Sequence, residues 1–503
     1  MDYGNKDDID QSPAWKESLS QQVARGGFWV FALRITDRGL GFIRLIILAR
    51  LLTPDDFGLL GISLLALSIL GTFSGTGFGA ALIQKKERTD EYLDTAWTVQ
   101  IIRGIVLFAI LFTVSPLVAI FFNTPEAASI IKVLAFTQLL GGFNNIGIVY
   151  FRKELEFHKQ FIYSFVSSVV AMLVAISLAF ILRNVWALVF GLLAGNVTAL
   201  ILSYIICSYR PKIEFNLAKT KELFGFGKWI LGSSILIFLG THGDDVFVGK
   251  LLGVATLGLY QMAYRLSNMP ATEITHMISQ VTFPAYSKMQ DNIPRLRESY
   301  LRVLQLTSFL SFPIAGLIFV LAPDFTKIFL GQKWLPIVFL IKILVISGLI
   351  RSIAATTGPI FSAIGEPKIE THWQAIRLAV LCILIYPCAV QWGIMGVAAS
   401  VVASTMISTI GFSKMAIKIT RCNFKIFSKI IFLPFMNSLM TITLIQICRR
   451  AFITIGIFEF IILSSVGIIS TFAFIYLFDR LFNYKGLFLI KDFYASTKGV
   501  HKI

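Results

Sequence analysis

The sequence predicts an all-α membrane protein of about fourteen transmembrane helices. Of its 503 residues 56% are hydrophobic, the mean hydropathy is +0.76, and only 15% are charged, against about 25% in soluble domains. Apolar runs of about 20 residues recur, and each is long enough to cross about 30 Å of hydrocarbon as a helix. The polar segments between them are short, so no soluble domain is inserted.

The ends of several runs coincide with residues that interrupt helices, as at Pro54, Pro125, Pro323 and Gly393. The predicted spans are residues 26–52, 57–83, 95–122, 129–150, 161–182, 185–207, 229–249, 257–285, 301–321, 335–363, 373–390, 394–417, 426–448 and 457–478. The whole body of the protein is therefore expected to lie in the bilayer.

The distribution of charge among the loops predicts the topology. Lysine and arginine gather in segments on the same side as the N-terminus, such as 85–88, 210–228 and 414–429. Opposite loops, such as 53–56 and 391–393, carry no basic residue. Cytoplasmic loops are the basic ones, so we expect an inner-membrane protein with both ends in the cytoplasm. The exceptions are Lys327, Lys333, Arg449 and Arg450.

Neither the net charge nor the motif content indicates an enzyme or a nucleic-acid-binding protein. The net charge of +17 resides in short loops, where the topology rule accounts for it. The five cysteines are scattered and the five histidines are widely separated, so no metal site is predicted. We find no phosphate-binding glycine loop, metalloprotease motif or serine–base arrangement. We expect no enzymatic activity, cofactor or nucleic-acid partner.

A weak internal repeat relates the first half of the chain to the second. With a shift of 200 residues and no gap, Trp29 aligns with Trp229, Arg50 with Lys250, and residues 58–59 with 258–259, both Gly-Leu. Six spans separate the copies, so both should have the same orientation. Parallel repeats of this kind predict a pseudo-two-fold axis along the membrane normal and a cavity between two lobes.

The repeat predicts the division of the chain. We expect a cytoplasmic N-terminal segment at residues 1–25, an N-lobe of six helices at 26–207, a cytoplasmic linker at 208–228, a C-lobe of six helices at 229–417, two further helices at 418–480, and a cytoplasmic tail at 481–503. The last two helices have no counterpart in the repeat.

Ionisable side chains inside the apolar runs are the candidate site. Each costs about 2.5–3.5 kcal/mol at a helix centre on insertion scales, so each should face a cavity or a partner. In the first run Arg34, Asp37, Arg38, Gly41 and Arg44 fall within about 120° of the helix circumference. One interpretation is a cationic cavity wall. The other is that Asp37 neutralises Arg34 or Arg38 merely to permit insertion.

The eighth run has a continuous polar face that consists of Arg265, Asn268, Thr272, His276 and Ser279. Glu273 lies about 80° from Arg265 around the same helix. The face serves either a cavity or hydrogen bonds between helices. In the seventh run, beside His242 and Asp245, Asp244 falls where Arg44 stands in the first copy. We predict that Arg44 and Asp244 pair across the axis and close one gate.

A cavity lined by arginines favours an anion, because guanidinium binds phosphate with two parallel hydrogen bonds and stays charged when dehydrated. This chemistry suits a bulky phosphorylated amphiphile better than a small organic cation. The candidate substrate-binding residues are Arg34, Arg38, Arg44, Arg265 and Arg351. The candidate coupling or gating residues are Asp37, Asp244, Asp245, Glu273 and His276.

Several motifs occur together. Residues 27–29 read GFW, 47–59 read ILARLLTPDDFGL and 77–85 read GFGAALIQK; FRKELEF follows at 151–157, VGKLLG at 248–253 and FPAYSK at 283–288. The set resembles the polysaccharide transporter family, the lipid-linked oligosaccharide flippases of O-antigen, colanic-acid and teichuronic-acid type. These belong to the superfamily of the multidrug and toxic-compound exporters (MATE) and the lipid II flippase. The resemblance extends to about residue 420.

The resemblance implies a MATE-like, two-lobed fold with alternating access through a central cavity. It implies translocation of an undecaprenyl-pyrophosphate-linked oligosaccharide repeat unit for surface polysaccharide synthesis, coupled to proton or sodium exchange. Expected partners are that substrate, membrane lipids, a polysaccharide polymerase and glycosyltransferases. Alternatives are a drug or cation exporter, or a lipid II-type flippase, of the same fold. A membrane-embedded glycan polymerase or ligase would need a large outer loop, which the sequence lacks.

Overall fold

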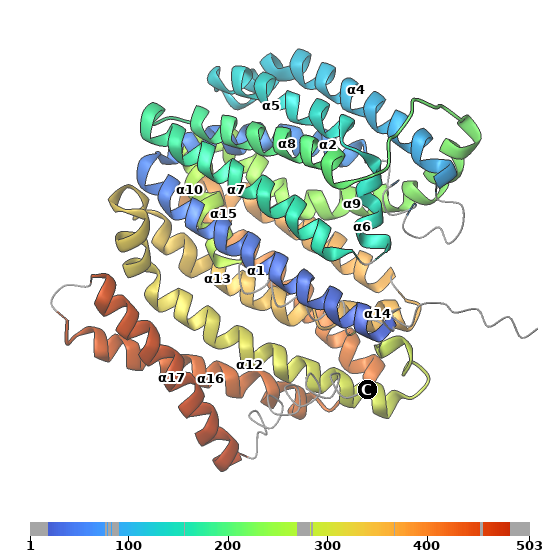
Figure 1. The fold of residues 1–503 in the computed structure, drawn as a ribbon. Helices are drawn as coiled ribbons and strands as arrows, with labels where there is room; N and C mark the ends of the chain where they lie inside the picture. The colour runs from blue at the N-terminus through green and yellow to red at the C-terminus, as the bar shows by residue number, and fades with distance from the viewer. Residues whose placement is uncertain are drawn as a thin grey trace, which may run out of the picture.

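The computed structural model describes residues 19–75, 78, 82, 90–154, 156–268, 282, 285–366, 368–452 and 456–482. Every regular element within these ranges is a helix. The helices run roughly along one common direction, as expected of a transmembrane bundle (Figure 1). The predicted all-α membrane fold is therefore confirmed.

We refer to residues 19–206 as the N-half and residues 217–420 as the C-half. The N-half contains α1 (Leu19–Leu51), α2 (Pro54–Phe73), α4 (Asp90–Phe122), α5 (Glu126–Phe143), η1 (Ile146–Ile148), α6 (Val149–Lys153), α7 (Phe157–Leu182) and α8 (Trp186–Ile206). The C-half contains α9 (Leu217–Leu251), α10 (Val254–Ser267), α12 (Ile293–Phe325), η2 (Thr326–Leu330), η3 (Gln332–Trp334), α13 (Ile337–Ala354), α14 (Gly358–Ala363) and α15 (Lys368–Thr420). The chain continues with α16 (Phe424–Arg449) and α17 (Ile457–Phe482), which pack beside α12 (Figure 1).

Within the described residues, ten helices are long and apolar enough to cross a membrane. The helix α15 counts once among them, although it covers two predicted spans and is broken at Gly393, whose φ is 57°. The charged helices α1 and α9 and the short α10 are not among the ten. The count of fourteen spans stays a prediction, as do the lobe boundaries. The predicted linker at 208–228 overlaps α9, which already begins at Leu217.

The TPDD motif produces a tight corner between α1 and α2. Thr53 caps α2, because its hydroxyl accepts from the Asp56 backbone amide at 3.3 Å while the Asp56 carboxylate accepts from the Thr53 amide at 2.8 Å. Pro54 occupies the first turn of α2, where its missing amide hydrogen costs nothing. This capping box ends one helix and starts the next within three residues.

The two halves meet through glycines that the repeat relates. A Cβ atom at Gly58 of α2 would overlap the carbonyl of Val254 in α10, and a Cβ at Gly258 would overlap the carbonyl of Pro54. Both pairs are related by the same shift of 200 residues, so the contact is reciprocal. A two-fold relation between the copies produces this pattern, and the contact supports the predicted repeat. The backbones of α2 and α10 approach closely here because neither helix has a side chain at the crossing.

The C-terminal helices are tied to the C-half by a half-buried ion pair. Arg449 of α16 donates to Asp324 of α12 at 2.8 Å, and the Asp324 side chain is only 6% exposed. The apolar contacts around it include Leu321, Ile445 and Leu463. A buried carboxylate that loses its partner is strongly destabilising.

Replacing Arg449 should therefore destabilise the docking of α16. We expect Arg449→Ala to lower the free energy of unfolding by about 3 kcal/mol, measured on the purified protein in detergent. Adding Asp324→Asn to Arg449→Ala should recover most of the loss, because the uncompensated charge is then removed. Equal stability of Arg449→Ala and the parent would contradict the assignment.

Candidate functional site

A chamber of about 240 Å³ lies where the two halves meet. It is lined by α1, α2, α7 and α8 of the N-half and by α10 of the C-half. Its walls are mostly apolar, with Leu45, Leu48, Leu60, Leu64, Leu188, Leu192, Phe57 and Met262 among the lining residues. The chamber also contains the side chains of Arg44, Gln261 and Arg265.

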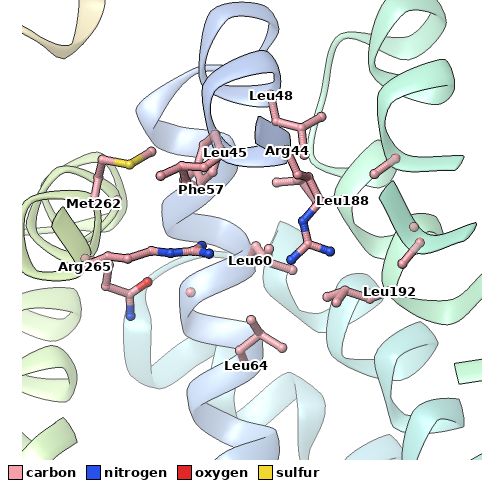
Figure 2. Close-up of a pocket in the computed structure, with 16 residues that line it drawn as sticks. Arg44, Leu45, Leu48, Phe57, Leu60, Leu64, Leu188, Leu192, Met262 and Arg265 are labelled. Carbon is pink, nitrogen blue, oxygen red and sulfur yellow. The ribbon is translucent and has the colours of Figure 1, made fainter. Parts of the chain in front are cut away.

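Arg44 and Arg265 enter this chamber from different halves of the protein. Figure 2 shows both guanidinium groups directed into the chamber on either side of Leu60. Arg265 reaches across to α1, since a Cβ atom at Gly41 would lie 3.5 Å from its Nη2. Neither guanidinium forms a hydrogen bond or ion pair with any residue that the structure describes. Two cations therefore share a largely apolar space.

The remaining charges of α1 surround this pair. Arg38 and Asp37 lie close enough to act electrostatically on Arg265, and Asp37 also acts on Arg44. Both Asp37 and Arg38 are exposed, while Arg34 is half-buried. The Asp37 carboxylate accepts a hydrogen bond from Ser168 of α7 at 3.3 Å. Among the described residues, three arginines (Arg38, Arg44 and Arg265) act on one another here and Asp37 is the one carboxylate near them, so a single Asp37 does not neutralise their charge.

A second polar cluster forms within the C-half. Asp244 of α9 is 4% exposed and accepts a hydrogen bond of 2.6 Å from the hydroxyl of Tyr260 in α10. Its other oxygen accepts from the Asp245 backbone amide at 3.1 Å. The Asp245 carboxylate in turn contacts Nδ1 of His242 at 3.1 Å. These contacts hold both carboxylates in place beside α10.

Arginines from two other helices complete the second cluster. Arg351 of α13 donates to the hydroxyl of Tyr264 at 2.6 Å and to Oδ1 of Asn268 at 3.3 Å. Arg377 of α15 donates to the carbonyl of Gly240 and is within electrostatic range of Asp244 and Arg351. Among the described residues, two arginines and two aspartates balance in charge in this cluster, beside the imidazole of His242, whereas the chamber is rich in arginine.

The structure thus separates the predicted site residues into two groups. Arg44 and Arg265 line the chamber and Arg38 and Asp37 lie near it, whereas Arg351, Asp244 and Asp245 belong to the balanced cluster in the C-half. Arg34 lies further towards the start of α1. The predicted ion pair of Arg44 with Asp244 is not formed. Asp244 faces Tyr260 of its own half instead, because that hydroxyl satisfies it at lower desolvation cost than a charge carried from another half. Glu273 and His276 lie outside the described residues.

Sequence reasoning missed the side chains that organise these groups. Tyr260 and Tyr264 lie four residues apart in α10 and read as ordinary helix aromatics, yet their hydroxyls join α10 to Asp244 and Arg351. Gln261 was missed because its contact lies between the halves: it faces Gly61, the residue that the shift of 200 aligns with it, and a Cβ atom at Gly61 would overlap its Oε1. In the sequence, the one sign that Tyr260 and Tyr264 act together is their spacing of four residues, which places them on the same face of α10.

Removing the Tyr260 hydroxyl should weaken the second cluster. In Tyr260→Phe one oxygen of the buried Asp244 loses its hydrogen bond, and we expect a loss of about 1–3 kcal/mol in the free energy of unfolding. Thermal unfolding in detergent would measure it, with Tyr386→Phe as the control because Tyr386 is 60% exposed. An unchanged Tyr260→Phe protein would show that Asp244 does not depend on this bond.

The fold and the chamber define a multi-pass membrane transport protein, in which two helical halves enclose a charged space. The chain also matches the family described as "Polysaccharide biosynthesis protein" over residues 47–339. It therefore belongs to that family, and the resemblance seen in the sequence is confirmed.

Relatives and solved structures agree with this assignment. The lipopolysaccharide biosynthesis protein WzxC of Escherichia coli is 26% identical, with 84% of this chain and 87% of the relative aligned. The succinoglycan biosynthesis transport protein ExoT of Rhizobium meliloti is 22% identical, with 71% and 72% aligned. The lipid II flippase MurJ in an inward closed conformation superposes with a TM-score of 0.70 at 16% identity, over 90% of this chain and 98% of that one. An inward-facing multidrug resistance MATE transporter gives 0.62 at 16% identity, over 76% and 94%.

The two structures share the fold of this chain, and the fold class predicted from the sequence is that of their superfamily. The protein is a transporter rather than an enzyme, in keeping with its relatives.

Proposed function

We propose that this protein is a flippase that moves a polyprenyl-diphosphate-linked oligosaccharide across the cytoplasmic membrane for surface polysaccharide synthesis. The observation that carries the proposal is the pair Arg44 and Arg265, which enter one chamber from the two halves and form no ion pair with the residues that the structure describes. The names of the relatives place them in lipopolysaccharide and succinoglycan biosynthesis. Such glycans are large and polar, so they need a protein path through hydrocarbon.

The chemistry of the chamber favours a diphosphate over other ligands. Charged side chains in an apolar space are costly unless an opposite charge replaces the lost water. A diphosphate offers several oxygens that can accept charge-assisted hydrogen bonds from two guanidinium groups. A cationic drug would be repelled by the excess of arginine in the same place. The leucine-lined wall is compatible with the apolar carrier next to the diphosphate.

The transport cycle follows from the position of the chamber between the halves. With both chain ends in the cytoplasm, the face where α1 ends and α2 begins is external, and it is closed by the reciprocal contact of α2 with α10. We infer that the substrate enters from the cytoplasmic leaflet while this face is closed. Arg34 and Arg38 extend the cationic surface towards the start of α1. Asp244 and Asp245 are the proposed sites of proton or sodium coupling, and enzymes that build and polymerise the repeat unit are the proposed partners.

The decisive experiment is deletion of the gene followed by extraction of polyprenyl-linked lipids from each leaflet. We expect the repeat unit to accumulate on its carrier in the cytoplasmic leaflet and surface polysaccharide to be lost. Complementation with the intact gene should restore both. An unchanged distribution of the carrier-linked unit between the leaflets would refute the proposal.

A further inference from the structure

The last turn of α1 is fastened to the C-half by Arg50. This arginine stands in the motif ILARLLTPDDFGL but on the opposite side of α1 from the chamber residues. Its guanidinium donates to the carbonyl of Phe329 at 2.9 Å and to the carbonyl of Ile328. These carbonyls belong to η2, the last turn before the loop of the C-half at Gly331. Arg50 therefore caps the C-terminal end of a helix from the other half.

The C-half returns the same kind of contact. The indole Nε1 of Trp334 donates to the carbonyl of Ala49 at 2.8 Å, and Nζ of Lys333 donates to the carbonyl of Arg50 at 3.0 Å. Trp334 is fully buried and packs edge-on against Phe57 of α2, with ring centroids 5.2 Å apart. Each helix end thus supplies the donors that cap the other. Two helix C-termini with like partial charges meet here, and the cationic caps offset their repulsion.

Glycine at position 331 makes room for this arrangement. Its φ is +99°, which non-glycine residues rarely adopt, and a Cβ atom there would lie 3.3 Å from Nη1 of Arg50. The loop can therefore turn sharply beside the guanidinium without touching it with a side chain.

The contact that the repeat relates to that of Arg50 is the contact of Lys250 with the end of α4. Lys250 ends α9 at the position that matches Arg50, and Phe121 and Phe122 end α4. Nζ of Lys250 lies 5.1 Å from the centre of the Phe121 ring, a cation–π contact. Phe122 packs on Gly249, where a Cβ atom would lie 3.0 Å from the ring. The end of α9 thus meets the end of α4 as the end of α1 meets η2. Among the described residues, hydrogen bonds from side chains to backbone carbonyls of the opposite half are found at the Arg50 contact.

We propose that Arg50 is a gating residue of the transport cycle, and that its paired caps with Lys333 and Trp334 latch the external face shut. The inference rests on the proposed function, because a latch has meaning only in a protein that alternates between states. In this cycle η2 and the end of α1 separate when the chamber opens to this face. That motion breaks four cross-half hydrogen bonds on the Arg50 side, whereas the described contacts on the Lys250 side include the cation–π contact of Lys250 and the packing of Phe122 on Gly249.

Cysteine labelling tests the latch independently of any substrate. In a background without the five native cysteines, Leu64→Cys reports on the chamber, and Asp55→Cys marks the face on which α2 begins. A membrane-impermeant maleimide is added to intact cells and, separately, to inverted vesicles. We expect Arg50→Ala to raise the labelling rate of Leu64→Cys from the Asp55 face about tenfold or more, because even one lost charge-assisted bond shifts a two-state equilibrium by that factor.

The matched control is Lys250→Ala, which should change the rate less than about threefold, as expected for a single cation–π contact of a half-buried lysine. Lys333→Met is the second variant, and it should raise labelling in the same direction as Arg50→Ala while leaving Arg50 itself intact. An unchanged rate in both Arg50→Ala and Lys333→Met, or an equal rise in Lys250→Ala, would overturn the latch. If Arg50→Ala raises the labelling rate but deletion of the gene leaves the carrier-linked lipids unchanged, the latch is supported and the proposed function is refuted.

Discussion

The double substitution Arg44→Gln with Arg265→Gln should reduce surface polysaccharide at least about 100-fold in a complementation assay. Both guanidinium groups enter the chamber without a partner in the described structure. Each charge-assisted hydrogen bond to a bound phosphate contributes about 1.5–3 kcal/mol. Losing one such bond from each half should therefore lower the affinity for the phosphate by more than about 100-fold. Glutamine keeps a similar length and polarity, so the chamber should not collapse.

Two controls separate binding from folding. Arg302→Gln removes a guanidinium that is 63% exposed and pairs with Glu298 on the surface, and it should leave transport unchanged. Arg44→Lys with Arg265→Lys keeps the charge but loses the bidentate geometry, so partial activity is expected. The amount and the melting temperature of each variant in the membrane should match the parent. Full transport by the double glutamine variant would show that Arg44 and Arg265 are not needed to bind the substrate.

Adding a single methyl group at the crossing of α2 and α10 should abolish most transport. In Gly58→Ala or Gly258→Ala the new Cβ atom overlaps a backbone carbonyl of the partner helix, and a backbone atom cannot move aside as a flexible side chain can. The two helices must separate, so the face on which α2 begins no longer closes. We expect transport to fall more than about tenfold, because a closed state disfavoured by about 1.4 kcal/mol changes its population by that factor.

The helix α2 contains its own control for this prediction. Gly71 lies on the same helix, but nothing is within 4 Å of a Cβ atom placed there. Alanine is the better helix former by about 1 kcal/mol, so Gly71→Ala should be neutral or slightly stabilising. Loss of function in Gly58→Ala but not in Gly71→Ala would therefore come from the helix contact. Equal transport by both variants would show that the crossing tolerates separation.

Single helices and their ends were predictable from local sequence. A helix boundary was predicted at Pro54, where α2 begins, and the break at Gly393 was predicted at the residue where it occurs. These features depend on hydropathy, capping and backbone preference within a few residues. The polar face of α1 was likewise predictable, because helical periodicity fixes which of its residues point the same way.

Local sequence did not predict which charged side chains lie close together in the folded protein. Arg44 and Arg265 are more than 200 positions apart, and both lie in the chamber, while Arg351 turned out to bond to Tyr264 and Asn268. The shift of 200 residues suggested a partner for Arg44 in Asp244, but equivalent positions in a two-fold arrangement need not touch. Asp244 instead accepts a hydrogen bond from the hydroxyl of Tyr260 in its own half.

The sequence by itself determined the class of protein: apolar runs, basic loops and motifs define a helical membrane transporter of one family. Only the tertiary structure decided that two arginines share a chamber and that Arg50 caps a helix of the opposite half. The physical reason is the range of the interactions. Insertion and helix formation depend on neighbouring residues, whereas a site between halves depends on how closely distant helices approach, and at Gly58 and Gly258 that approach is set by the absence of a side chain.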